Sequence, residues 1–182
     1  MAMSFAGLGA VYFIPAATSP FKLGRMHATN EQRLDMLRLA TAGEPRFSVS
    51  DVETLKLGIS YTVDTVRHFT SVMPEAKLFF ILGADSLATL HQWKDAVSLV
   101  GNCEFITLAR SGRDVAQLEG FDAQTRARLA AGVVRDFNYE VSSTEIRRRL
   151  ASGESISELV NPDVFTYIQS HCLYGVAQEP QI

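Results

Sequence analysis

The sequence has only two cysteines, one tryptophan and no excess of basic residues in its 182 positions. Cys103 and Cys172 stand far apart without a CxxC or Cys/His cluster, which favours the reducing cytoplasm over a disulfide framework or a structural zinc site. The chain has 17 Lys and Arg residues against 20 Asp and Glu, a net charge of −3, whereas a nucleic-acid partner normally requires a basic excess. Its four histidines are isolated from one another, so no metal ligand is predicted.

Long apolar runs are also missing. The first 21 residues carry no charge, but no Lys or Arg precedes the apolar stretch, and Gly7, Gly9 and Pro15 interrupt it, which excludes a signal peptide. No other stretch approaches the roughly 18 apolar residues that a membrane helix requires. We therefore expect a soluble protein that does not bind a membrane.

Short β-prone runs alternate with helical patterns along the whole chain. The strand-like runs fall at residues 11–14, 47–50, 78–82, 105–108 and 133–139, and the run at 78–82 is apolar on both faces, as a central parallel strand is. The helical patterns fall at residues 2–8 (with Gly9 as the stop), 29–43, 62–72, 96–100, 124–131, 144–151 and 164–170. This alternation predicts an α/β fold with a doubly wound parallel sheet, in a single domain over residues 1–182, that binds ligands beyond the carboxyl ends of its strands.

The segment Ser142–Arg147 is the strongest local signal of a helix start. Ser142 and Glu145 have capping-box spacing, and the free N–H groups and positive dipole end of such a helix suit a phosphate. Arg147 lies within the first turns and is able to add a bidentate contact to phosphate oxygens. Taken alone, the segment favours an ordinary capped helix whose arginines face water, because capping boxes are common.

Two further candidate residues follow the apolar strand at 78–82. Asp85 stands where a carboxylate can accept hydrogen bonds from ribose hydroxyls, although it fits as well the N-cap of a helix at 86–90. Trp93 lies in a polar loop, where an indole is able to stack on an aromatic ring; the alternative is a tryptophan that fills the core.

The segment Ser60–Thr65 begins a helix with hydroxyls and free amides around Tyr61 and Thr62, which suits an anion or a carboxylate. Its plainer interpretation is a Ser or Thr N-cap. Lys22 ends a proline-punctuated loop after the first strand and can reach a phosphate, but a solvated loop lysine explains it more simply.

The order of these segments carries more information than any one of them. The segments occur along the chain in a fixed order. They are residues 13–16 (FIPA), 20–22 (PFK), Arg33 with 36–37 (ML), 51–53 (DVE), 60–65 (SYTVDT), 83–86 (GADS) with Trp93, and 142–147 (SSTEIR). This series resembles bacterial nicotinate-nucleotide adenylyltransferase, from about Leu8 to Tyr174. The SYTVDT, GADS and SSTEIR segments together are quite specific.

The resemblance implies a Rossmann-like nucleotidyltransferase fold and an enzyme of NAD biosynthesis. Its substrates would be ATP and nicotinate mononucleotide, its products deamido-NAD and pyrophosphate, and Mg²⁺ would bridge triphosphate oxygens. Trp93 would stack on the nicotinate ring, the helix start at Tyr61 and Thr62 would receive the carboxylate, and Asp85 would hold ribose. The implied phosphate and nucleotide contacts are Lys22, Arg110, Ser143, Thr144 and Arg147.

One part of the family pattern is missing. The family begins with a strand, a Gly-rich turn and a His-x-Gly-His loop that binds the ATP phosphates, and no such motif occurs in this sequence. We expect about 20 upstream residues that contain it, by strand and helix geometry. Without them the chain should bind nicotinate mononucleotide weakly, make little deamido-NAD and self-associate into a homo-oligomer. Two alternatives stay open: a non-catalytic nucleotide-binding or regulatory module, and a sister nucleotidyltransferase with another phosphate-ester acceptor.

Overall fold

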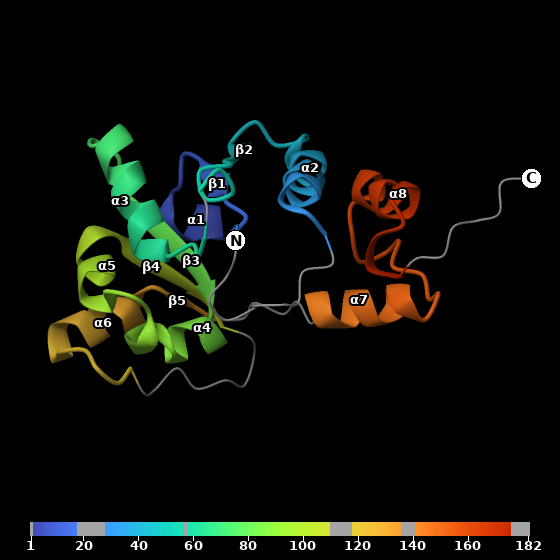
Figure 1. The fold of residues 1–182 in the computed structure, drawn as a ribbon. Helices are drawn as coiled ribbons and strands as arrows, with labels where there is room; N and C mark the ends of the chain where they lie inside the picture. Colours follow the sequence, from blue (N-terminus) through green and yellow to red (C-terminus); the bar gives the residue numbers. More distant parts are fainter. Residues whose placement is uncertain (1, 18–27, 57, 110–117, 136–140, 176–182) are drawn as a thin grey trace, which may run out of the picture. The chain divides into compact units, whose positions relative to one another are not determined.

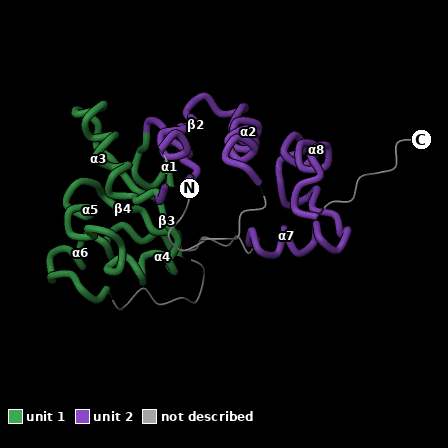
Figure 2. Tube along the Cα trace, viewed as in Figure 1, with its two compact units in different colours: residues 1–8, 60–139 green, residues 9–59, 140–182 purple. Residues whose placement is uncertain are grey.

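The computed structural model describes residues 2–17, 28–56, 58–109, 118–135 and 141–175. The chain divides into two compact units, shown in different colours in Figure 2. The first unit contains residues 1–8 and 60–139, and the second contains residues 9–59 and 140–182. The single domain expected over residues 1–182 stays a prediction.

The first unit contains a parallel sheet in the order β3-β4-β5. Its strands are β3 (Phe79–Gly83), β4 (Glu104–Leu108) and β5 (Val133–Val134). Phe79 pairs with Glu104 and Gly83 with Leu108, so β3 and β4 end together at one edge. The prediction of parallel strands is confirmed. The strand expected at 133–139 is shorter in the structure: β5 ends at Val134, residue 135 is not part of a strand, and residues 136–140 lie outside the described residues.

Helices accompany this sheet, and all of them except the first bury side chains in a common core (Figure 1). They are α1 (Ala2–Ala6), α3 (Thr62–Val72), α4 (Ala84–Ala88), α5 (Ala96–Asn102) and α6 (Ala123–Ala131), with a short 3₁₀ turn at Leu90–Gln92. Val63 of α3 packs with Leu87, Leu90 and Leu99, and each is at most 1% exposed. Burial of one such side chain contributes about 1.5–3 kcal/mol. The apolar face predicted for residues 62–72 is therefore confirmed as core.

The second unit holds the other parallel pair, β1 (Val11–Phe13) and β2 (Phe47–Val49). The helix α2 (Asn30–Thr41) connects them, and the capping box predicted at its start is present. The Thr29 hydroxyl accepts from the Gln32 N–H at 3.1 Å, while the Gln32 side chain accepts from the Thr29 N–H at 2.9 Å. Both residues satisfy backbone groups that the first helical turn leaves without partners.

The rest of this unit consists of α7 (Ser143–Ala151), α8 (Pro162–Ser170) and a 3₁₀ turn at Leu173–Gly175. Its core includes Leu150, Ile156 and Ile168. The Tyr167 hydroxyl of α8 donates to Asp35 of α2 at 3.2 Å, so these two helices are joined by a polar contact as well as by packing.

One helix ends earlier than the sequence predicted. The stop was expected at Gly9, whereas α1 ends at Ala6 and Gly7 takes the left-handed conformation with φ +60°. Glycine adopts this conformation without the clash that a Cβ atom causes, so the first glycine after the helix terminates it. No helix within the described ranges is long and apolar enough to cross a membrane.

Gly132 marks a close approach between α6 and the sheet. Its carbonyl accepts the Thr107 N–H at 2.9 Å, and a Cβ atom at this position would lie 2.0 Å from the carbonyl oxygen of Phe105. No side chain fits there without a shift of the β4 backbone, so the connection between α6 and β5 requires glycine.

We expect Gly132→Ala to lower the free energy of unfolding by about 3 kcal/mol, because the added methyl group overlaps the β4 backbone. Gly101→Ala is the matched control, since nothing lies within 4 Å of a Cβ atom there. The control should change stability by less than about 1 kcal/mol, in the stabilising direction. Urea unfolding of both variants measures the difference, and equal stabilities would contradict the close approach.

Candidate functional site

The carboxyl end of β3 leads directly into a helix start. Gly83 is the extended N-cap residue of α4, and Asp85 is exposed in the first turn. The interpretation of Asp85 as an N-cap is therefore wrong, because β3 continues through Gly83 and the helix already begins at Ala84. A carboxylate in the first turn is favoured by the helix dipole. Asp85 thus lies at the sheet edge where α/β folds bind their ligands.

Trp93 is half-buried in the loop between the Leu90–Gln92 turn and α5. Its ring packs edge-to-face on Phe80 of β3, with centroids 5.8 Å apart and planes at 86°. The indole N–H is buried and has no hydrogen-bond partner among the described residues. Trp93 contacts the core cluster and still keeps exposed surface, and its stacking on an aromatic ligand ring stays a prediction.

The start of α3 lies close to the residue that follows Trp93. Tyr61 is the N-cap residue, and its side chain makes no capping hydrogen bond, so the plain Ser or Thr N-cap interpretation is wrong. The Lys94 ammonium lies 4.1 Å from the centroid of the Tyr61 ring and donates to Asp64 at 3.1 Å. Thr62 is half-buried as the first helical residue. The structure thus connects the Trp93 loop to the helix start that the sequence singled out.

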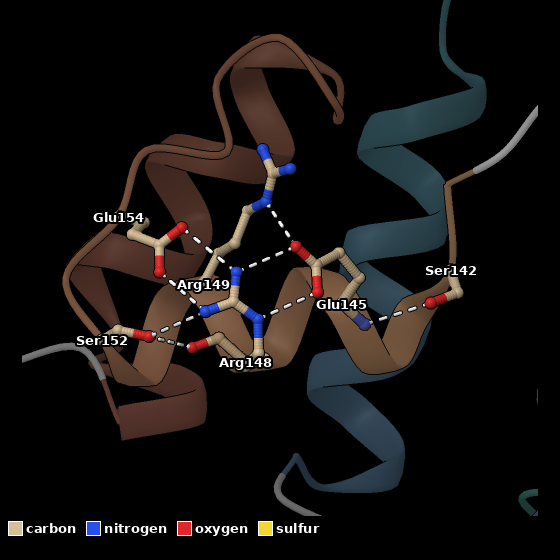
Figure 3. A network of polar contacts seen from close by, with 6 residues as sticks. All are labelled: Ser142, Glu145, Arg148, Arg149, Ser152 and Glu154. Atoms are coloured by element: carbon tan, nitrogen blue, oxygen red, sulfur yellow. Dashed lines mark hydrogen bonds and ion pairs between the residues drawn. The ribbon is translucent and has the colours of Figure 1, made fainter.

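The start of α7 in the second unit confirms half of the predicted capping box. The Ser142 hydroxyl accepts from the Glu145 N–H at 3.1 Å, and Ser143 and Thr144 are exposed in the first turn. The Glu145 carboxylate does not complete a capping box: it pairs with Arg148 at 2.9 Å and Arg149 at 2.8 Å (Figure 3). Two guanidinium groups attract a carboxylate more strongly than one backbone N–H does.

Arg148 also pairs with Glu154 at 2.7 Å, so two carboxylates neutralise two of the three consecutive arginines (Figure 3). Hydrogen bonds from Arg148 and Arg149 lower the pKa of Glu145 to about 2. Within the part of the chain that the structure describes, Arg147 takes part in no ion pair. No ion pair among the described residues therefore compensates the positive charge of Arg147.

A half-buried cation, Arg33, organises the loop after β1. One Arg33 guanidinium nitrogen donates to the Ala16 carbonyl and to the Asn30 side chain, each at 2.6 Å. Burial lowers the pKa of Arg33, but a guanidinium group stays charged. Arg33 thus joins the segment that leads toward Lys22 to the start of α2.

Two predicted site residues, Lys22 and Arg110, lie outside the described residues. Tyr61, Thr62, Asp85 and Trp93 belong to the first unit, and Ser143, Thr144 and Arg147 to the second. The described residues contain no group of three or more His, Cys, Asp or Glu side chains that could hold a metal ion.

Comparisons with known proteins identify the family. The cytidylyltransferase-like family model matches residues 2–149. A probable nicotinate-nucleotide adenylyltransferase of Rhodopirellula baltica is 35% identical over 170 residues, which cover 91% of this chain and 79% of the relative. A protein of the same name from Neisseria meningitidis serogroup C is 39% identical over 172 residues, 92% of this chain and 85% of the relative. The chain belongs to the nicotinate-nucleotide adenylyltransferase family.

Solved structures agree on the fold of this adenylyltransferase family member. A Plasmodium falciparum nicotinic acid mononucleotide adenylyltransferase, complexed with NaAD, matches with a TM-score of 0.71 at 16% identity, covering 94% of this chain and 85% of that one. A putative nicotinate-nucleotide adenylyltransferase from Vibrio parahaemolyticus matches with a TM-score of 0.65 at 17% identity, covering 96% and 83%. The predicted Rossmann-like α/β class is confirmed.

The sequence analysis missed four charged residues beside the Trp93 loop: Asp64, Arg67, Lys94 and Asp95. In the sequence only Asp64 and Arg67 are spaced to interact, because residues three apart place their opposite charges on one helical face. Their partners lie 28 and 30 residues away along the chain, so sequence spacing does not connect them.

The arginine pairs make the stability of α7 pH-dependent. The pKa of Glu145 is lowered from 4.5 to about 2 in the folded protein, so its contribution is complete above pH 4.5 and is lost as the pH falls through about 2. Glu145→Gln should lower the thermal midpoint by about 1–4 °C at pH 6, and this difference should vanish near pH 2.

Thermal melts of both proteins between pH 6 and pH 2 test the expectation. Glu158→Gln is the control, because Glu158 is exposed and has no ion pair among the described residues. A difference between wild type and Glu145→Gln that persists unchanged to pH 2 would show that packing, not charge, is responsible.

Proposed function

We propose that this protein transfers the adenylyl group of ATP to nicotinate mononucleotide, which yields deamido-NAD and pyrophosphate in NAD biosynthesis. The names of its relatives support the reaction, and so does the NaAD bound to the Plasmodium falciparum enzyme. The geometry that supports it best is the half-buried Trp93 on a loop whose next residue, Lys94, contacts the start of α3. An aromatic surface next to a helix start suits a flat ring that carries a carboxylate.

In this proposal Trp93 stacks on the pyridine ring, and the backbone N–H groups at Tyr61 and Thr62 receive its carboxylate. The absence of a side-chain cap from Tyr61 supports this role, because that side chain does not occupy the helix N-terminus. A carboxamide would bring its own N–H donors toward those amides. The site should therefore prefer the acid over the amide.

The remaining roles concern ribose and phosphates. Asp85 accepts hydrogen bonds from ribose hydroxyls, which its exposed place beyond β3 supports. Ser143, Thr144 and Arg147 bind phosphate, which the helix dipole and the lack of an ion pair to Arg147 among the described residues support. Lys22 and Arg110 are proposed phosphate and nucleotide contacts on sequence grounds alone.

The reaction requires no protein nucleophile. A phosphate oxygen of nicotinate mononucleotide attacks the α-phosphorus of ATP in line, and pyrophosphate leaves from the opposite side. Catalysis then depends on holding the two substrates in position and on neutralising charge at the phosphates. We propose that Mg²⁺ enters as the Mg–ATP complex, since Mg²⁺ in such sites is bound largely through substrate phosphates and water. A cytoplasmic location is proposed as well, supported by two cysteines that are both free thiols.

The reaction is tested on the purified chain with Mg–ATP and either mononucleotide. We expect calorimetry to detect nicotinate mononucleotide binding at least about tenfold tighter than nicotinamide mononucleotide, a difference that one unsatisfied polar group explains. Chromatography of the same mixtures measures deamido-NAD, of which we expect little because the sequence has no His-x-Gly-His motif. An absence of affinity for the acid would overturn the proposed function.

The ring-stacking role is tested at Trp93. Trp93→Ala should weaken binding of nicotinate mononucleotide about tenfold, because an aromatic stacking contact is lost, and should leave ATP binding unchanged. Trp93→Phe keeps an aromatic face and should recover most of the affinity, which separates stacking from a general loss of core packing. Unchanged affinity in Trp93→Ala would refute the role.

A further inference from the structure

Four charged side chains join the loop that carries Trp93 to the first two turns of α3. Asp64 and Arg67 lie on α3, and Lys94 and Asp95 directly follow Trp93. Lys94 donates to Asp64 at 3.1 Å, and Arg67 pairs with Asp95 and donates to the Ser98 hydroxyl at 3.0 Å. We call Asp64, Arg67, Lys94 and Asp95 the α3–loop bridge.

The charges of the bridge alternate in sign along its path. Arg67 also lies 3.6 Å from Asp64, so each carboxylate is close to at least one cation and the network runs Lys94, Asp64, Arg67, Asp95. The helices α3 and α5 lie side by side, which brings the two segments together (Figure 1). The pairs Lys94–Asp64 and Asp95–Arg67 therefore connect two successive loop residues to α3.

The backbone conformation at Asp95 fixes the direction in which the loop leaves Trp93. Asp95 has φ +49° and ψ +48°, a left-handed conformation that few non-glycine residues adopt, and its carbonyl accepts the Leu99 N–H at 3.0 Å. The chain turns here from Trp93 into α5. The ion pair from Arg67 holds the side chain of the residue that makes this turn.

Lys94 holds the other end of the connection. Its ammonium lies over the ring of Tyr61, the N-cap residue of α3, and bonds a carboxylate in the first turn of the same helix. The indole of Trp93 is meanwhile packed on Phe80 of β3. Tyr61 is thus contacted both by the core cluster and by Lys94, while Trp93 packs on the core cluster.

We propose that the α3–loop bridge sets the spacing between the Trp93 indole and the start of α3, so that its members are positioning residues for a pyridine ring and its carboxylate. The inference rests on the proposed function, which assigns ring and carboxylate to these two places. The side chains in the two pairs between α3 and the loop are 42–49% exposed, so these ion pairs add little to the stability of the fold. The effect of the bridge should be found in ligand affinity.

Asp64→Asn is the decisive substitution, because two explanations predict opposite results. If Asp64 acts only through its charge, its removal lowers the negative potential near the helix start and strengthens binding of an anionic carboxylate. If Asp64 positions the loop through Lys94, its removal weakens binding. We expect the dissociation constant for nicotinate mononucleotide to rise about two- to fivefold, the range typical of an exposed ion pair, with that for ATP unchanged.

Two further variants separate positioning from general damage. The double variant Asp64→Lys with Lys94→Asp restores opposite charges in reversed order and should recover part of the affinity that Asp64→Lys alone loses. Arg38→Gln is the matched control, since it removes an exposed ion pair to Asp35 on α2, and it should leave the affinity unchanged. Thermal midpoints of all variants should stay within about 4 °C of the wild type.

Calorimetry with nicotinate mononucleotide, nicotinamide mononucleotide and ATP measures these constants on the full chain. Wild-type protein that fails to bind the acid would contradict the proposed function itself. Wild-type protein that binds the acid, together with an Asp64→Asn variant that binds it equally well or more tightly, would overturn the positioning role alone. Weaker acid binding by Asp64→Asn with intact ATP binding supports the inference.

Discussion

The pairing of β3 with β4 is the constraint on which the candidate site depends. The two strands run parallel and in register from Phe79 with Glu104 to Gly83 with Leu108, so both end at the same edge of the sheet. The chain leaves β3 directly into α4, which places Asp85 at that edge, and returns through the loop that carries Trp93. A shift in this register would displace all of these residues together, because their connections to β3 are short.

In the first unit, buried apolar side chains and exposed ion pairs have different structural roles. Nearly inaccessible leucines at positions 87, 90 and 99 hold the segments on either side of Trp93 in the core. Ion pairs with Asp64 and Arg67 then set where the exposed part of the loop meets α3. Hydrophobic contacts are non-directional, whereas an ammonium between a carboxylate and an aromatic face defines a position.

The second unit uses its charges differently. At α7 the carboxylates of Glu145 and Glu154 neutralise Arg148 and Arg149, and none of the described ion pairs includes Arg147 (Figure 3). Three consecutive arginines therefore do not act alike. A helix start that binds an anion gains from a cation in its early turns, and neutralised neighbours limit the repulsion among the three side chains.

The sequence by itself determined most of the helices, the parallel α/β class and the family. Thr29, Ser142 and the apolar stripe of α3 act within a few residues of chain, so their effect is visible in local spacing. Only the tertiary structure decided that Gly83 rather than Asp85 caps α4, that Glu145 turns to two arginines, and that Lys94 meets Asp64. Such choices depend on groups brought together from distant parts of the chain or on competing partners, and no local pattern records which of them prevails.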